Sequence, residues 1–422
     1  MTPYPEEPLP TVDPDQLRAD LVALLSIPSV SGSAAEPDVQ AWLAERWSGE
    51  GLDVDRWDID LDALTADPQF PGMEVDRHHA LGVTATLHGT GGGSTLLLDG
   101  HTDVVPPGDL DAWSGDPFAV RAVIVDGQER LVARGAYDMK AGGAAMWAAV
   151  RAVADSGISL RGDVILAPVS GEEDGGLGTF ALLRHGVRAD MCIVPEPTEL
   201  NIVPGNGGAL TFRLTVHGLA AHASMRTSGV SVIEKFIPVY RALEALEARR
   251  NAVVDPIMAR WPIAYPLSIG TVHAGDWAST VPDLLVAEGR LGVAIGESVE
   301  HARAELEATV AETCAADPWL ADHPVTVTWW GGQFASGRTD PSHPITAIVG
   351  EEHRVLFGTQ PTVYGGPYGS DLRLLAGIGG IPTVHYGPGV PESAHTPDEY
   401  VATQQVVDAA NAMVRMIVRI CG

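Results

Sequence analysis

The sequence predicts an α/β fold: a doubly wound, mixed sheet into which a smaller α+β domain is inserted. In the first and last parts of the chain, short apolar runs bounded by glycine and proline alternate with longer alanine-rich stretches of helical spacing. The middle of the chain instead reads strand, helix, strand, strand, helix, strand, the order of a split βαβ domain. A chain of 422 residues is also long for one core, so two domains are expected.

The elements of the larger domain follow from local patterns. A helix is expected to begin at Pro14, because Asp13 can accept hydrogen bonds from the first free N–H groups and proline is tolerated in the first turn. The strands expected to be buried on both faces are STLLLDG (94–100), DVILAPV (163–169), MCIVP (191–195) and IPTVHYG (381–387). The helices expected between them are 139–157 and 179–186.

The inserted domain is expected over residues 209–333 as a four-stranded, ferredoxin-like α+β unit. Its expected strands are 209–218, 267–275, 284–295 and 325–331, and its expected helices are 229–250 and 298–314. The larger domain then consists of residues 1–208 and 334–422. A small sheet of this kind leaves an edge strand and one face to be covered, so this domain is expected to form a homodimer.

Charge and cysteine usage narrow the function classes. The chain has 26 Lys and Arg against 55 Asp and Glu, a net charge of −29, which argues against nucleic acid and membrane surfaces as partners. Three widely spaced cysteines form no CxxC pair, so neither a disulfide framework nor a thiolate zinc site is expected. The N-terminal residues lack a signal-peptide pattern, and a cytoplasmic location is expected.

Metal-competent side chains fall at the ends of the expected strands, where open α/β sheets build their sites. These residues are His101, Asp103, Asp138, Glu172, Glu173, Glu196 and His395. Any one of them has a plain structural explanation, since an HxD pair is usually a polar contact and adjacent glutamates are usually a solvated turn. Their joint occurrence at strand ends favours a site for two adjacent divalent metals, which needs several N or O ligands and a bridging carboxylate.

The chain resembles the two-zinc amidohydrolases that include acetylornithine deacetylase, succinyl-diaminopimelate desuccinylase, aminoacylase and glutamate carboxypeptidase. The matching segments are DGHTDVVP, ARGAYDMKAG, SGEEDGGLGT, VPEPT, HGLAAHAS and YGPGVPESAHTPDEY, in the family's order. The resemblance implies that Asp138 bridges two ions, with His101 and Glu196 on one and Glu173 and His395 on the other. It further implies that Glu172 is the general base and that Asp103 orients His101.

The implied reaction is hydrolysis of an amide in an N-acyl amino acid by a metal-activated water. The expected cofactors are two divalent ions, zinc first, with cobalt or manganese also suited to these ligands. A dipeptidase or carboxypeptidase that cuts beside a terminal carboxylate is the alternative enzyme. A non-catalytic binding protein on the same fold is disfavoured, because such a protein would be expected to have lost the base or a ligand.

Residues of the inserted domain are implied in substrate contact. His222 matches the family's lid histidine, which stabilises the developing oxyanion, often from the partner subunit. Arg290 lies about two positions earlier than the family's substrate-carboxylate arginine, so it is either that residue, since residues two apart in a strand share a face, or a surface residue. Ser279 replaces the family's usual asparagine, which puts the pocket contacts in doubt.

Outside the inserted domain, Asp371 is expected either to support the substrate pocket or to cap the N-terminus of a helix. The other histidines considered, His78, His79, His217, His343, His353 and His385, are expected to be surface or packing residues.

Overall fold

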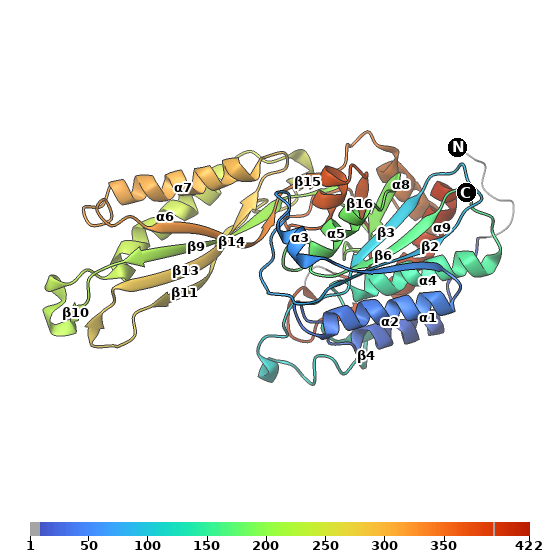
Figure 1. Cartoon of the computed structure of the whole chain (residues 1–422), viewed down its shortest axis with the longest axis horizontal. Coiled ribbons are helices and arrows are strands. Elements are labelled where there is room, and N and C mark those ends of the chain that lie inside the picture. The colour runs from blue at the N-terminus through green and yellow to red at the C-terminus, as the bar shows by residue number, and fades with distance from the viewer. Residues whose placement is uncertain (1–8, 391–392) are drawn as a thin grey trace. The chain divides into compact units, whose positions relative to one another are not determined.

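The computed structural model describes residues 9–390 and 393–422 (Figure 1). The chain divides into two compact units. The first comprises Met1–Gly205, Arg338–Tyr364 and Asp371–Gly422, and the second comprises Asn206–Gly337 and Gly365–Ser370. The short segment 365–370, which the sequence patterns placed with the larger domain, thus groups with the second unit.

The first unit is built on a six-stranded mixed sheet with the strand order β1-β2-β6-β3-β7-β16. Strands β3, β6, β7 and β16 run parallel, β2 pairs antiparallel with β6, and β1 pairs antiparallel with β2 at the edge of the sheet. The bounds are β1 Asp53–Asp58, β2 Leu81–Leu87, β3 Leu96–His101, β6 Val164–Val169, β7 Met191–Val194 and β16 Thr383–His385. The mixed sheet of an α/β fold is therefore confirmed.

Helices cover both faces of this sheet (Figure 1). Strand β3 shows why: Leu96 and Leu98 pack into the core made by α1, α2, α4 and α9, while Leu97 packs with Phe180 of α5 in the core of the other face. The bounds are α1 Pro14–Leu25, α2 Ala35–Gly49, α3 Leu61–Thr65, α4 Lys140–Ser156, α5 Leu177–His185, α8 Pro344–Phe357 and α9 Thr403–Cys421. The predicted N-cap of α1 is confirmed, because the Asp13 side chain accepts hydrogen bonds from two backbone N–H groups at the start of the helix.

A separate three-stranded antiparallel sheet lies in the same unit, with the order β17-β5-β4. Its strands are β4 Arg121–Val125, β5 Gln128–Val132 and β17 Tyr400–Ala402. The sequence patterns did not predict this sheet, because its strands are short and β17 lies about 270 positions from its partner. Strand β17 begins directly after the segment that carries His395.

The second unit contains a four-stranded antiparallel sheet with the order β11-β13-β9-β14 and two long helices. Leu210, Phe212 and Leu214 of β9 alternate toward a core that also takes in residues of α6 and α7. The bounds are β9 Gly208–His217, α6 Val232–Arg250, β11 Leu267–Ala274, β13 Leu284–Val293, α7 Val299–Ala315 and β14 Thr326–Phe334. The short strands are β8 Gly205–Asn206, β10 Ala221–His222, β12 Thr280–Val281 and β15 Gly337–Arg338.

The three cysteines are free and buried. Within the described part of the chain, no helix combines the length and the apolar character needed to cross a bilayer.

Candidate functional site

The chain brings metal-competent side chains together at one edge of the six-stranded sheet. Strand β3 ends at His101, and the neighbouring parallel strands β6 and β7 end at Val169 and Val194. The carboxyl ends of parallel neighbours meet at the same edge, so the loops that follow carry Glu172, Glu173 and Glu196 to the place where His101 ends.

One side of the cluster is formed by His101. Its Nε2 lies 3.0 Å from Oδ1 of Asp138 and 3.8 Å from Oε1 of Glu196. Its Nδ1 lies 2.9 Å from the backbone carbonyl oxygen of Asp103. Because a carbonyl only accepts, Nδ1 carries a proton, and Nε2 is left to face the two carboxylates.

The other side is formed by His395. Its Nε2 lies 3.5 Å from Oδ2 of Asp138 and 3.4 Å from Oε2 of Glu173. Asp138 therefore turns one carboxylate oxygen toward each histidine. His101, Asp138 and Glu173 can each offer one atom within 4.8 Å of the others. This central position of Asp138 is what a ligand shared by two ions requires.

Asp103 has a role that the sequence patterns did not predict. Its carboxylate is 3.8 Å from Nδ1 of His101, so the atom that contacts the ring is the backbone carbonyl. The carboxylate instead accepts the backbone N–H groups of Glu172 (3.2 Å) and Glu173 (3.3 Å) and the hydroxyl of Ser31 (2.9 Å). Asp103 thus holds the loop that presents the two glutamates, in addition to supporting His101 through its main chain.

The pKa shifts of the clustered side chains indicate that a positive charge among the carboxylates is favourable. Burial and then the Asp138 carboxylate raise the pKa of Glu173 and Glu196. Hydrogen bonds to Asp138 and Glu173 raise the pKa of His395 to about 11. Burial opposes the charge on His101 and on Asp138, but their mutual contact outweighs it, raising the pKa of His101 and lowering that of Asp138.

The donor set fits divalent cations. Imidazole nitrogen and carboxylate oxygen are the ligands that zinc and related ions take in proteins. Within the described residues, Oε1 of Glu173 is buried and has no hydrogen-bond partner. An unpaired buried carboxylate oxygen is costly, and a cation beside it would satisfy it.

Glu172 is buried in the same loop, and its main chain is held by Asp103. Burial raises its pKa well above the usual range, and the Asp371 and Glu196 carboxylates add to that effect against His101. A carboxylate with a raised pKa can both take and return a proton near neutral pH. Asp371 itself is buried and accepts the hydroxyl of Thr179 at 2.6 Å.

The predicted substrate residues belong to the second unit. His222 is exposed at the end of β10, where its Nδ1 lies 2.8 Å from the Ser224 hydroxyl. Arg290 is exposed on β13, in register with Thr211 and Ser268. The backbone carbonyl of Ser279 accepts the N–H of Ala223 at 2.8 Å.

The remaining histidines lie on the surface or pack inside. His78, His79 and His217 are exposed, and His343 caps α8. His353 and His385 are buried, and Nδ1 of His353 lies 2.8 Å from the Tyr386 hydroxyl oxygen.

Sequence reasoning missed two buried charge networks that support the site. Arg77 forms paired 2.8 Å hydrogen bonds to Glu36 of α2 and to Asp174, the residue after Glu173. Arg134 pairs with Glu399, which also binds the backbone that leads to Asp138. The only sequence signal was the presence of Asp174 and Glu399 inside the quoted motifs, and the motifs did not reveal their partners.

The chain is similar in sequence to two proteins that are named as deacylating enzymes. An N-formyl-4-amino-5-aminomethyl-2-methylpyrimidine deformylase from Bacillus subtilis is 27% identical over 407 residues, covering 91% of this chain and 89% of the relative. A succinyl-diaminopimelate desuccinylase from Methylobacterium nodulans is 35% identical over 270 residues, 61% of each protein.

Solved structures share the fold. A metallo-carboxypeptidase of the M20 family from Sulfolobus solfataricus superposes with a TM-score of 0.76 at 16% identity, covering 96% of this chain and 99% of the other. A dinuclear metal-binding M20 peptidase from Bacillus subtilis gives a TM-score of 0.63 at 17% identity, covering 97% and 98%. The model of peptidase family M20/M25/M40 matches residues 97–419, well over half of the sequence, and the chain therefore belongs to that family.

Proposed function

We propose that this chain is a dinuclear metal amidohydrolase that removes the acyl group from an N-acyl amino acid. The observation that carries the proposal is the position of Asp138, whose two carboxylate oxygens face His101 on one side and His395 on the other. The deformylase and desuccinylase relatives support the deacylase branch, since both names describe removal of an acyl group.

The proposed ligands are His101, Asp138 and Glu196 for one ion and His395, Asp138 and Glu173 for the other. Zinc is the proposed metal, with cobalt and manganese as alternatives. When bound, the ions supply an acidified water and polarise the scissile carbonyl. The pairing of each histidine with its own glutamate follows the distances of 3.8 Å and 3.4 Å.

Glu172 is proposed to take the proton of the attacking water and to deliver it to the departing amine nitrogen. Its burial suits this task, because a carboxyl with a raised pKa holds the transferred proton until the leaving group needs it. Asp103 keeps Glu172 and Glu173 in place through their backbone N–H groups, and its carbonyl fixes the ring of His101.

The second unit is proposed to be a ferredoxin-like lid and dimerisation domain, residues 209–333 of the chain. Its βαββαβ order and its four-stranded sheet support the fold assignment. His222 is proposed to stabilise the negative charge that develops on the carbonyl oxygen, from its own or the partner's subunit. Arg290 is proposed to bind the substrate carboxylate.

A homodimer is proposed through this unit. Ile233, Ile237 and Tyr240 are exposed at helical spacing along α6, and β11 is an edge strand of the sheet. A second copy would cover both. Sedimentation of a fully active chain as a monomer would overturn the dimer.

The second candidate is a dipeptidase or carboxypeptidase. The fold shared with a metallo-carboxypeptidase favours it, and the metal site would serve either substrate equally well. A cytoplasmic location also remains part of the proposal, supported by the three free cysteines.

The test combines metal analysis with product analysis on N-formyl, N-acetyl and N-succinyl amino acids and on dipeptides. The wild type should release the amino acid from an acyl substrate. Glu172→Gln should keep its metal while kcat falls by about 10² to 10⁴-fold. Glu45→Gln, which changes an exposed carboxylate on α2, is the matched control. Hydrolysis of dipeptides alone would establish the peptidase, and bound metal without hydrolysis of any substrate would defeat the deacylase.

A further inference from the structure

The carboxylate of Glu399 is fully buried four positions after His395. Its side chain has no exposed surface, and that of its partner Arg134 has only 2%. A buried carboxylate persists only where hydrogen bonds and opposite charge replace water. The contacts of Glu399 therefore indicate what it holds.

Those contacts all converge on the turn that delivers Asp138. One oxygen, Oε1, accepts the backbone N–H groups of Tyr137 (2.8 Å) and Asp138 (3.1 Å). The other oxygen, Oε2, pairs with Nη1 of Arg134. The backbone carbonyl of Glu399 also accepts the N–H of Ala133 at 3.1 Å. One residue thus contacts both ends of segment 133–138.

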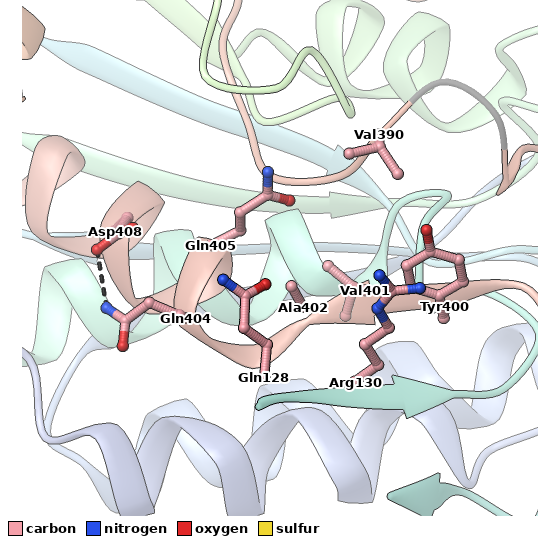
Figure 2. A pocket seen from close by; sticks show the side chains of 9 residues that line it. All are labelled: Gln128, Arg130, Val390, Tyr400, Val401, Ala402, Gln404, Gln405 and Asp408. Atoms are coloured by element: carbon pink, nitrogen blue, oxygen red, sulfur yellow. Dashed lines mark hydrogen bonds between the residues drawn. The ribbon is translucent and has the colours of Figure 1, made fainter. Parts of the chain in front are cut away.

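The chain that follows Glu399 is itself fixed. Strand β17 pairs with β5, with Tyr400 opposite Val132 and Ala402 opposite Arg130. Figure 2 shows this pair from the side of a cavity of about 220 Å³ that the two strands help to line. The guanidinium of Arg130 lies over the Tyr400 ring at 4.3 Å from its centroid. Glu399 is therefore held in place from the β17 side.

Asp138 and His395 come from segments about 260 positions apart, yet their side chains lie 3.5 Å from each other. Glu399 lies on the His395 segment and binds the backbone N–H of Asp138. Its carboxylate is thus a direct link between the two segments.

We propose that Glu399 is a positioning residue that sets the spacing between Asp138 and His395 and so tunes the affinity of the site for its metal ions. The proposal rests on the metal site described under the proposed function. A purely structural ion pair would affect only the stability of the fold. A link between two ligand segments must also change how tightly the folded protein holds metal.

Two variants test this link. In Glu399→Gln the side chain keeps one acceptor oxygen, so it cannot serve the two N–H groups and Arg134 at once. In Glu399→Asp the charge is kept but the carboxylate is withdrawn by one methylene. The control is Glu352→Gln, which alters another fully buried carboxylate paired with an arginine, Arg415, at 3.1 Å.

The measurements are Zn²⁺ affinity by chelator competition, metal per chain, and thermal unfolding of the metal-free proteins. We expect both Glu399 variants to bind Zn²⁺ about 10 to 100-fold more weakly than the wild type. Glu352→Gln should lower the unfolding temperature with unchanged Zn²⁺ affinity.

Unchanged Zn²⁺ affinity in a folded Glu399 variant would overturn the proposal. If Glu399→Gln does not fold, the affinity of Glu399→Asp decides. If the wild type itself binds no Zn²⁺, the proposed function fails first, so the two failures can be told apart.

Discussion

The two units place their charged residues in opposite ways. In the first unit, most candidate ligands and their supports are buried or nearly so, and Asp103 and Glu399 have no exposed surface. The exception is His395, whose side chain is 50% exposed. In the second unit, His222 on β10 and Arg290 on β13 are themselves exposed, while the core beside the four-stranded sheet is apolar. Packing and hydrogen bonds fix the first set in one geometry. The second set is exposed to a substrate that arrives from solution.

Mutations in the two units should therefore have different effects. A residue in the buried network supports other charged side chains. Its loss should therefore lower the free energy of unfolding or the affinity for metal. An exposed residue of the second unit is not part of the buried core, so its loss should appear mainly when substrate is present.

The largest effect is expected for Arg77→Met. This change leaves the buried carboxylates of Glu36 and Asp174 without their cation, and it should lower the free energy of unfolding by about 3–5 kcal/mol. Urea unfolding measures it. Arg18→Met, which removes a partly exposed pair with Glu129, should cost at most about 1 kcal/mol. Equal costs for the two variants would contradict the contrast between buried and exposed pairs.

His222→Ala tests the exposed unit. If the imidazole stabilises the developing oxyanion, kcat should fall by about 10² to 10³-fold with metal content and unfolding temperature unchanged. The matched control is His273→Ala, an exposed histidine of β11 in the same unit. Full activity of His222→Ala would remove this residue from the mechanism.

Arg290→Ala should raise KM, because a charge-assisted hydrogen bond to the substrate carboxylate contributes about 1.5–3 kcal/mol. This corresponds to an increase of roughly 10 to 150-fold. Arg213→Ala is the control, since Arg213 lies on the same face of the sheet and pairs with Glu288. An unchanged KM would make Arg290 a surface residue, the other interpretation of the sequence.

The most gradual effect, spread over several pH units, concerns His385 in the core of the first unit. Burial lowers its pKa from 6.5 to about 3, so below pH 6.5 the unfolded chain binds a proton that the folded chain does not. The free energy of unfolding should therefore fall as the pH decreases from 6.5 toward 3, by up to about 1.4 kcal/mol per pH unit from this group. His385→Gln should lose that part of the slope in acid unfolding experiments. Parallel pH profiles for the two proteins would show that His385 is not neutral in the fold.

The strand ends explain how much of the site could be predicted. His101 and Glu196 follow parallel neighbours in the sheet, so their meeting is a consequence of the apolar runs that precede them. The pairing of Arg134 with Glu399 joins residues 265 positions apart and leaves no local pattern. The same holds for Arg77, and the contact of His101 with a carbonyl depends on a backbone path that composition does not reveal.

The middle of the chain shows the complementary case. The order of strands and helices over 209–333 was predictable, because each element has its own hydrophobic period. The grouping of segment 365–370 with that unit was not, because it depends on contacts made only after folding.

The proposed function requires that Asp138 is shared by two ions. The most direct measurement is the number of zinc ions per chain, with their affinities, for the wild type and for Asp138→Ala. We predict about two ions for the wild type, and for Asp138→Ala a loss of affinity at both positions, because each ion loses the same carboxylate. Two ions bound with unchanged affinity in Asp138→Ala, or a wild type that binds none, would contradict the account.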